Sequence, residues 1–265
     1  MISRRQFSLG IKNYPYHERN YRLKYTAKDL YYYNVKVKES DLAIGVDIMS
    51  YSDSLVSLCE KKLRQVRQII EDYIAQHPDF KTSLVPIKLQ PGAPEIIRYM
   101  SDAALMADVG PMAAVAGVVA QEIGIELMNY TQEVLVENGG DIYINTKLER
   151  NIAVFAGESP FSHKIGIKVY PEEGPLGICT SSGTVGPSLS FGQADAVVVK
   201  AQSTPLADAV ATAAGNIVST PDDFIKAIDL VKGIPGIQGI LIIQKDQMAV
   251  WGNMEIAPIR GQGLK

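Results

Sequence analysis

Residues 205–216 constrain the fold most, because they read PLADAVATAAGN and are nearly all small. We expect a helix here, packed closely against neighbouring backbone or a ligand. Asp208 and Thr212 stand four positions apart, so on a helix they share one face, about one turn from each other. Their carboxylate and hydroxyl oxygens are ligand types that Mg²⁺ accepts beside substrate phosphates. Alternatively, Asp208 only stabilises the helix start, Thr212 is a core residue, and Gly215-Asn216 ends the helix.

Length and charge limit the class of protein. The chain has 265 residues, 46% of them hydrophobic and 21% charged, as in ordinary globular proteins. We expect a single domain over residues 1–265, with two intertwined α/β subdomains as the alternative. The net charge of -3 argues against a nucleic-acid partner, since no basic excess is available to neutralise phosphates. The sequence leaves open whether the chain forms a homo-oligomer.

Cysteine usage and hydropathy point to the cytoplasm. The two cysteines, Cys59 and Cys179, are far apart and form no CxxC pair, so neither a zinc ribbon nor a disulfide framework is indicated. The first ten residues lead into polar, tyrosine-rich sequence rather than an apolar signal core. Charged residues, glycine and proline interrupt the apolar stretch 103–125, which is typical of a buried helix. We therefore expect a cytoplasmic protein without a membrane partner.

Hydrophobic periodicity predicts an α+β fold, with mixed or antiparallel sheets packed against helices. The expected helices are 54–76 with Ser52 or Asp53 as N-cap, 95–107, 111–123, one carrying Asp208, and 222–231. The expected strands are 21–25, 30–38, 42–47, 133–136, 141–145, 152–156, 164–170, 196–200, 239–244 and 248–251.

Paired glycines mark a second candidate ligand element. Gly139 and Gly140 lie between two expected strands and are followed by Asp141. Glycine permits positive φ and close approach of backbone to a ligand. A plain hairpin turn built on Asn138-Gly139 is the alternative.

Two more segments have the composition of a ligand site. Residues 179–186 read CTSSGTVG, and as a loop they would present several N–H and O–H donors to phosphates, although a plain polar loop has the same sequence. Residues 107–117 place Asp108 and Gly110 in an acidic turn before a small-residue helix. That small face is suited to packing against another backbone or a flat ring.

Taken in order, these segments resemble the ApbE family, the FAD:protein FMN transferases formerly described as thiamine-biosynthesis lipoproteins. The resemblance runs from about Asp108 to Thr212 and rests on spaced motifs. The motifs in this chain are Asp108-Val109-Gly110, Gly139-Gly140-Asp141, Thr180-Ser181-Ser182-Gly183 and Ala207-Asp208-Ala209-Val210-Ala211-Thr212. The CTSSGTVG string is similar to that of the short cytoplasmic branch of the family.

The resemblance implies an ApbE-like fold that binds FAD and Mg²⁺. It implies that Asp208 and Thr212 help to bind the metal. It also implies that the flavin nucleotide lies near Asp108, Gly110, Gly139, Gly140, Asp141, Thr180, Ser181, Ser182 and Gly183.

Two departures from the family pattern affect catalysis. Typical transferases have a lysine where this chain has Ala113-Ala114-Val115, and a histidine-containing stretch where this chain has residues 187–195. The histidines His17, His77 and His163 lie elsewhere and are expected to be surface or structural residues. Catalytic residues therefore stay unassigned, with Asp141 and Asp195 as the candidate bases.

Three functions remain open from the sequence. The first is a Mg²⁺-dependent enzyme that handles FAD or a related nucleotide, including FMN transfer. The second is a binding protein for such a ligand without transfer chemistry. The third is an accessory protein in sulfur assimilation that uses Cys179. The alternative interpretation of Cys179 is a buried, inert cysteine.

Overall fold

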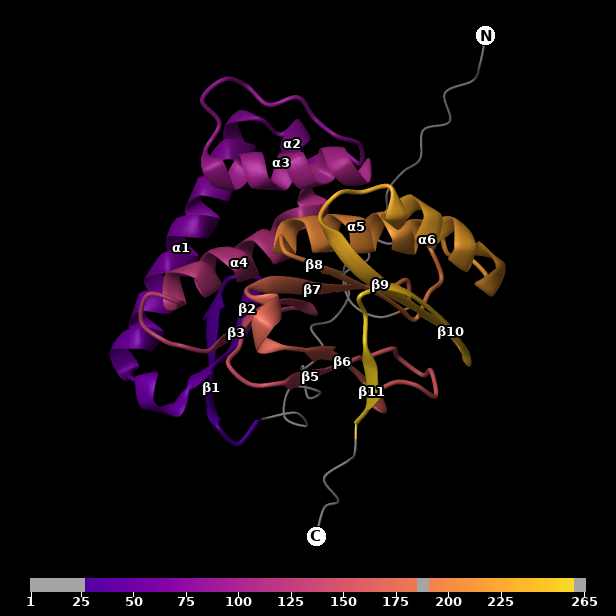
Figure 1. Cartoon of the computed structure of the whole chain (residues 1–265). Coiled ribbons are helices and arrows are strands. Elements are labelled where there is room, and N and C mark those ends of the chain that lie inside the picture. Colours follow the sequence, from indigo (N-terminus) through magenta and orange to yellow (C-terminus); the bar gives the residue numbers. More distant parts are fainter. Residues whose placement is uncertain (1–26, 185–190, 260–265) are drawn as a thin grey trace.

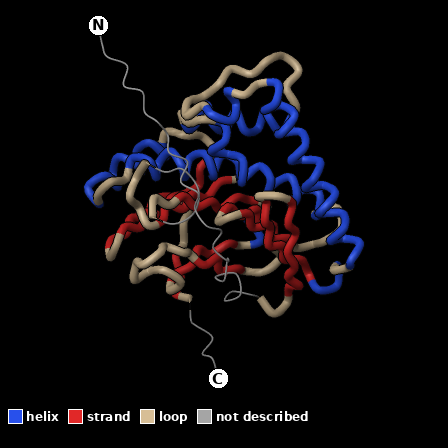
Figure 2. Tube along the Cα trace, turned by 180° about the vertical axis from the view of Figure 1, so that it is seen from behind, coloured by secondary structure: helices blue, strands red, loops and turns tan. Residues whose placement is uncertain are grey.

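The computed structural model describes residues 27–184 and 191–259, which form three layers (Figure 1). Helices cover one face of an eight-stranded sheet, and a three-stranded sheet lies against its other face, as the view from behind also shows (Figure 2). The strand orders are β1-β2-β3-β4-β7-β8-β9-β10 and β11-β6-β5. All the described strand pairs are antiparallel, so the expected α+β class is confirmed in its antiparallel form.

The large sheet is built from strands at both ends of the chain. Its members are β1 (Leu30–Val37), β2 (Ser40–Asp47), β3 (Val134–Asn138), β4 (Asp141–Asn145), β7 (Leu176–Ser181), β8 (Ala196–Ala201), β9 (Ile237–Gln244) and β10 (Gln247–Gly252). The small sheet contains β5 (Arg150–Ala153), β6 (Ile165–Val169) and β11 (Ile256–Pro258).

The helical layer has a long outer helix and a central helix of small residues. The α-helices are α1 (Asp53–Gln76), α2 (Asp79–Thr82), α3 (Glu95–Ala107), α4 (Val115–Leu127), α5 (Thr204–Ile217) and α6 (Phe224–Lys232). Short 3₁₀ turns are η2 (Ile48–Ser50), η3 (Pro111–Ala114), η4 (Pro171–Glu173) and η5 (Pro221–Asp223). The side chain of Ser52 accepts from the backbone N–H of Leu55, which makes Ser52 the N-cap of α1.

Strand alternation divides the core into two parts. On β8, Val197 and Val199 face the helices, whereas Ala196 and Val198 face the small sheet. Because successive side chains of a strand point to opposite faces, both faces of the large sheet are buried at its centre. The helix α5 is the most enclosed, and eleven of its residues are buried. Its small side chains allow this close packing.

Several predicted boundaries are wrong. Residues 179–181 belong to strand β7 and not to a loop, because Ile178 and Cys179 are buried and the strand pairs on both sides. The helix expected at 111–123 is divided into η3 and α4 and continues to Leu127. The Gly215-Asn216 pair does not end α5, which continues to Ile217. The strand expected at 21–25 lies outside the described residues.

Among the described residues, no single helix has both the length and the apolar composition of a membrane span. The segments Glu95–Ala107 and Pro111–Leu127 meet that test only together, across a bend of 108°.

Candidate functional site

Asp208 lies on α5 where this helix crosses the first turn of α4. Its Oδ2 accepts a hydrogen bond of 2.8 Å from the backbone N–H of Gly117. The N-cap residue of α4, Ala114, has no side chain that can cap, so Asp208 supplies this hydrogen bond from another helix. A Cβ on Gly117 would lie 2.6 Å from the carbonyl oxygen of Thr204 and 2.9 Å from the Cβ of Asp208. The close crossing therefore requires glycine.

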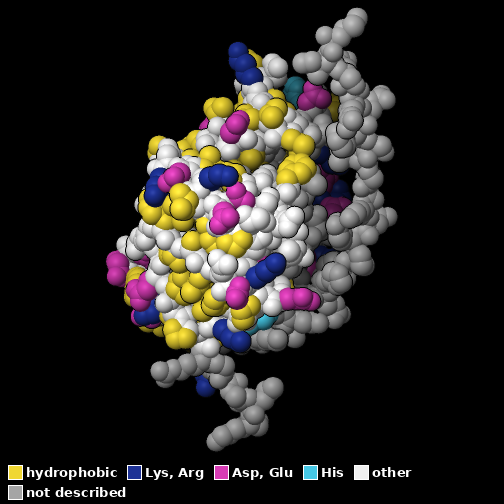
Figure 3. Space-filling model, turned by 90° about the vertical axis from the view of Figure 1, so that its right-hand side faces the viewer, with side chains coloured by type: hydrophobic (Ala, Val, Ile, Leu, Met, Phe, Trp, Pro, Cys, Tyr) yellow, Lys and Arg dark blue, Asp and Glu magenta, His cyan; other side chains and the backbone are white. Residues whose placement is uncertain are grey.

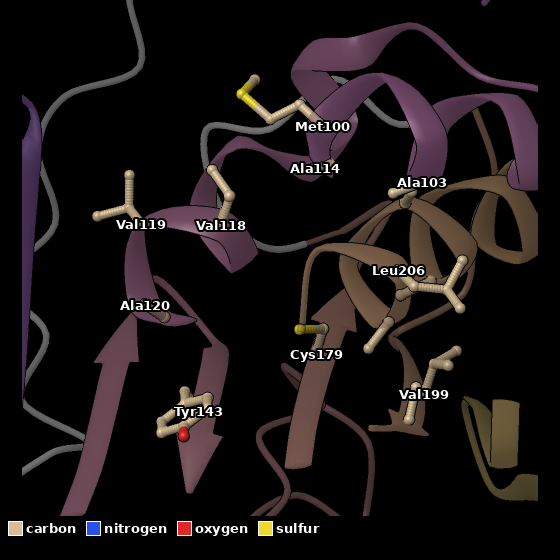
Figure 4. Packing of buried hydrophobic residues seen from close by; sticks show 14 of the residues in the cluster. Met100, Ala103, Ala114, Val118, Val119, Ala120, Tyr143, Cys179, Val199 and Leu206 are labelled. Atoms are coloured by element: carbon tan, nitrogen blue, oxygen red, sulfur yellow. The ribbon is translucent and has the colours of Figure 1, made fainter. Parts of the chain in front are cut away.

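Asp141 and Cys179 lie beneath Asp208 on neighbouring strands. The register that pairs Ile142 with Ile178 continues to place Asp141 opposite Cys179. Asp141 is 7% exposed, Cys179 is 0% exposed and Asp208 is 9% exposed. The thiol of Cys179 donates to the carbonyl oxygen of Thr204, 3.4 Å away. Figure 4 shows Cys179 in the apolar layer below the turn that carries Leu206.

This acidic cluster, defined as Asp141, Cys179 and Asp208, disfavours negative charge. Burial, followed by the nearby charge of Asp141, raises the pKa of Asp208, although the N–H groups of Gly117 and Ala116 oppose the shift. Burial also raises the pKa of the Cys179 thiol, and both carboxylates add to the shift. The thiol is thus kept protonated and enclosed, as expected for an inert buried cysteine and not for a sulfur-handling nucleophile.

The paired glycines form the tight turn between β3 and β4. Gly139 and Gly140 have φ values of 73° and 108°, which favour glycine. The hairpin alternative is therefore correct as a description of local structure. A Cβ on Gly140 would lie 3.8 Å from the carbonyl oxygen of Thr180, so the turn lies beside the end of β7.

The hydroxyl residues after Cys179 follow α5 toward its C-terminal end. Thr180 and Ser181 are half-buried on β7, and a Cβ on Gly215 would lie 3.2 Å from Ser181 Oγ. Thr212 is half-buried and follows Asp208 by one helical turn. Ser182 and Gly183 come after the strand, and Gly183 donates its N–H to the carbonyl oxygen of Ala194. The third and fourth motifs therefore run side by side.

The first motif has structural explanations. Asp108 is exposed and ends α3 in the left-handed conformation, with a φ of 54°. A Cβ on Gly110 would lie 1.8 Å from the carbonyl oxygen of Ser83, so the chain approaches too closely for any other residue. In the described structure, Asp108 is not among the residues hydrogen-bonded to Asp208.

Asp195 and the histidines, the other titratable residues considered from the sequence, make local contacts within the fold. Asp195 accepts from the backbone N–H of Lys245 at 2.6 Å and from Thr184 Oγ1 at 3.1 Å, which ties it to the β9–β10 turn. The ring of His77 packs on Tyr73, and that of His163 on Phe155. His17 lies outside the described residues.

Three residues were missed by sequence analysis as parts of this site. Gly117 holds Asp208, Gln121 Oε1 accepts from the backbone N–H of Thr204, and Asn138 Nδ2 donates to the carbonyl oxygen of Ala116. They fix α4 against α5 and against the glycine turn. Gly117 lay in the small-residue helix and Asn138 in the predicted hairpin turn, whereas Gln121 carried no recognisable sequence pattern.

Two surface hollows of about 400 and 370 Å³ lie along α1 and the segment before α3. No residue of the acidic cluster lines them. Among the described residues, no group of three or more His, Cys, Asp or Glu side chains is arranged to hold a metal ion. A metal at Asp208 would therefore need oxygen ligands from hydroxyl groups, backbone or the bound ligand itself.

The fold of this chain is similar to that of solved ApbE flavin transferases. The flavin transferase ApbE from Vibrio cholerae, in a mutant form, matches with a TM-score of 0.54 and 12% identity, over 84% of this chain and 97% of that chain. The apo form of the flavinyl transferase ApbE from Pseudomonas stutzeri matches with a TM-score of 0.50 and 12% identity, over 84% and 94%.

Sequence comparison then gives the family. A family model described as "AbpE bacteria" matches residues 24–230, and the chain belongs to this family. It is 39% identical to the UPF0280 protein of Methanococcus aeolicus over 214 residues, or 79% of this chain and 85% of the relative. It is also 39% identical to the UPF0280 protein of Methanothrix thermoacetophila over 221 residues, or 82% and 91%.

Proposed function

We propose that this protein binds a flavin nucleotide, FAD, together with Mg²⁺ along the contact of β7 with α5. The observation that carries the proposal is the convergence of three motifs, because Asp141, Cys179 and Asp208 meet while Gly140 lies beside Thr180. The family membership and the fold shared with flavin transferases support this ligand class.

The donor set is compatible with Mg²⁺. Asp208 and Thr212 would hold the ion, with Asp141 adding negative charge close by. Burial and the nearby charge of Asp141 raise the pKa of Asp208, and a cation between the two carboxylates would stabilise their charged forms. Hard oxygen donors also suit Mg²⁺, which commonly binds through one or two carboxylates and substrate phosphates. When bound, the ion would neutralise charge on the pyrophosphate of the nucleotide.

The remaining motif residues would bind the phosphates. The turn at Gly139 and Gly140 has no side chains, so a phosphate can approach its backbone closely. Thr180 and Ser181 are half-buried and supply hydroxyl donors beside α5. Gly117 and Gln121 hold α4 and α5 in place, which fixes the orientation of Asp208.

Binding without transfer is the second candidate. It is favoured by the sequence at two positions, because Ala113-Ala114-Val115 and residues 187–195 lack the lysine and histidine of typical transferases. FMN transfer requires activation of an acceptor hydroxyl, and Asp141 and Asp195 are the remaining candidate bases. The two candidates share the ligand and differ in whether AMP is released.

Thermal-shift measurements with flavins, purine nucleotides and Mg²⁺ test the binding proposal. We expect FAD with Mg²⁺ to stabilise the wild-type protein, because a ligand that binds the native state must do so. Asp208→Asn should lose the Mg²⁺-dependent part of this stabilisation by FAD. The control Asp102→Asn, at an exposed position on α3, should keep it. Equal stabilisation of all three proteins, or none, would contradict the proposal.

Incubation with FAD, Mg²⁺ and an acceptor protein distinguishes the two candidates. Release of AMP with flavin attached to the acceptor indicates transfer. Stabilisation by FAD without AMP release indicates binding alone.

A further inference from the structure

The strand β10 is an edge of the large sheet with no charged residue and no proline. Its sequence is QMAVWG, and the next two residues, Asn253 and Met254, are also uncharged. Met248 is 44% exposed and Val250 is 41% exposed. Figure 3 views the molecule from this side and shows patches of apolar side chains between scattered charges. Natural edge strands are usually protected by charges, prolines or bulges, because an open edge pairs with another strand.

The opposite edge, β1, carries such protection. It includes Lys36, which is exposed, and Lys38 follows it directly. The two edges thus differ within the strands themselves, since the charges nearest to β10, Lys245 and Asp246, lie in the turn before it.

Within residues 27–184 and 191–259, the hydrogen-bonding pattern of the sheet shows which backbone groups of β10 have no strand partner. The N–H of Asp195 donates to the carbonyl oxygen of Ile243, so Ile243 points toward β8 and its neighbours in β9 point toward β10. The partners of those neighbours are Ala249, opposite Ile242, and Trp251, opposite Ile240. The N–H and C=O groups of Met248 and Val250 therefore point away from the sheet.

The side chains of β10 fit a second copy of the same strand. Ala249 and Trp251 face the helical layer, and Met248, Val250 and Gly252 face the other side. If two copies pair antiparallel about Val250, Trp251 lies opposite Ala249, and Met248 lies opposite Gly252. Each large side chain then meets a small one on the same face, as cross-strand packing requires.

We propose that β10 pairs with β10 of a second copy about a two-fold axis at Val250. The two eight-stranded sheets then form one continuous antiparallel sheet, with both helical layers on the same side. The contact is isologous, so it closes as a dimer and does not extend into a fibre. A strand of six residues spans about 20 Å, so we expect a dimer that depends on protein concentration.

Sedimentation velocity over a wide concentration range tests this proposal. We expect wild-type protein to change from monomer to dimer. Val250→Lys should weaken dimerisation by about tenfold or more, because the two lysines would face each other at the axis. The control Asn34→Lys, at an exposed position on β1, should behave as wild type.

A second variant and two spectroscopic measurements guard against misfolding. Val250→Pro removes an N–H that points away from β9, so the sheet can be retained while dimerisation is lost. Trp251 is the only tryptophan, and its fluorescence should change on dimerisation in wild type but not in the variant. Amide exchange at Met248 and Val250 should slow as concentration rises. A monomer at every concentration, or a dimer unaffected by both Val250 variants, would overturn the proposal.

Discussion

Two groups of buried charge in this molecule are built in opposite ways. Arg150 is 9% exposed and forms ion pairs at 2.5 Å with Asp29 and with Glu133, which is itself buried. In the acidic cluster, burial and the nearby charge of Asp141 raise the pKa of Asp208, and Asp208 accepts a hydrogen bond from the backbone N–H of Gly117. The first group contains oppositely charged partners, whereas the proposed Mg²⁺ would supply positive charge to the second. This difference separates a structural charge network from a candidate binding site.

The largest expected effect on stability is at the ion pairs of Arg150. Arg150→Met leaves Glu133 buried without its cation and should lower the free energy of unfolding by about 3–5 kcal/mol. Arg64, which pairs with Glu60 at the surface, is the matched control, and Arg64→Met should lower it by less than about 1 kcal/mol. Urea denaturation measures both values. Equal effects would remove the distinction between buried and surface pairs.

A smaller effect is expected where α4 crosses α5. Gly117→Ala places a Cβ within 2.6 Å of the carbonyl oxygen of Thr204, so the helices must separate. Overpacking of this kind lowers the free energy of unfolding by about 1–3 kcal/mol. Gly233→Ala is the control, because its Cβ would lie 3.5 Å from the nearest carbonyl oxygen, an ordinary contact. If Gly117→Ala denatures in urea like wild type, the crossing is not tightly packed.

The stability of the acidic cluster should respond in the other direction. Asp208→Asn removes a buried charge but keeps an oxygen that accepts from Gly117. We therefore expect the free energy of unfolding, without ligand, to be unchanged or to rise by about 1 kcal/mol at neutral pH. Urea denaturation in the presence of a chelator measures this change. A loss as large as that of Arg150→Met would show that Asp208 is a structural charge.

The pH dependence of stability should have opposite signs at the two groups. The Arg150 guanidinium holds the pKa of Asp29 below its usual value, so this group stabilises the protein above that value and loses its effect as pH falls. The pKa of Asp208 is raised, so the native state binds more protons than the unfolded state, and stability falls as pH rises. Denaturation of wild type, Asp29→Asn and Asp208→Asn from acid to neutral pH checks both signs. Parallel curves for the three proteins would contradict the assignment.

Much of the fold was predictable because local sequence and tertiary structure agree. The long helix α1 has apolar residues at helical spacing and a serine cap, and both were recognised. The strand β7 was missed, because Thr180, Ser181 and Gly183 resemble a polar loop, while its strand character comes from burial between β4 and β8.

The site was predictable only in part for a similar reason. The spacing of Asp208 and Thr212 predicted a shared helix face, but the meeting of Asp208 with Asp141 and Cys179 depends on strand register. The hydrogen bond from Gly117 spans 91 positions along the chain, which no local pattern encodes. The roles of the motif residues, the single domain and the cytoplasmic location stay predictions.

Calorimetric titration of FAD into the protein, with Mg²⁺ or with a chelator, tests the central claim most directly. We expect binding of FAD that is strengthened by Mg²⁺ in the wild type. Asp208→Asn should lose the strengthening while keeping its fold by circular dichroism. Binding that is independent of Mg²⁺ in both proteins, or no binding of FAD under either condition, would contradict a flavin and metal site at Asp208.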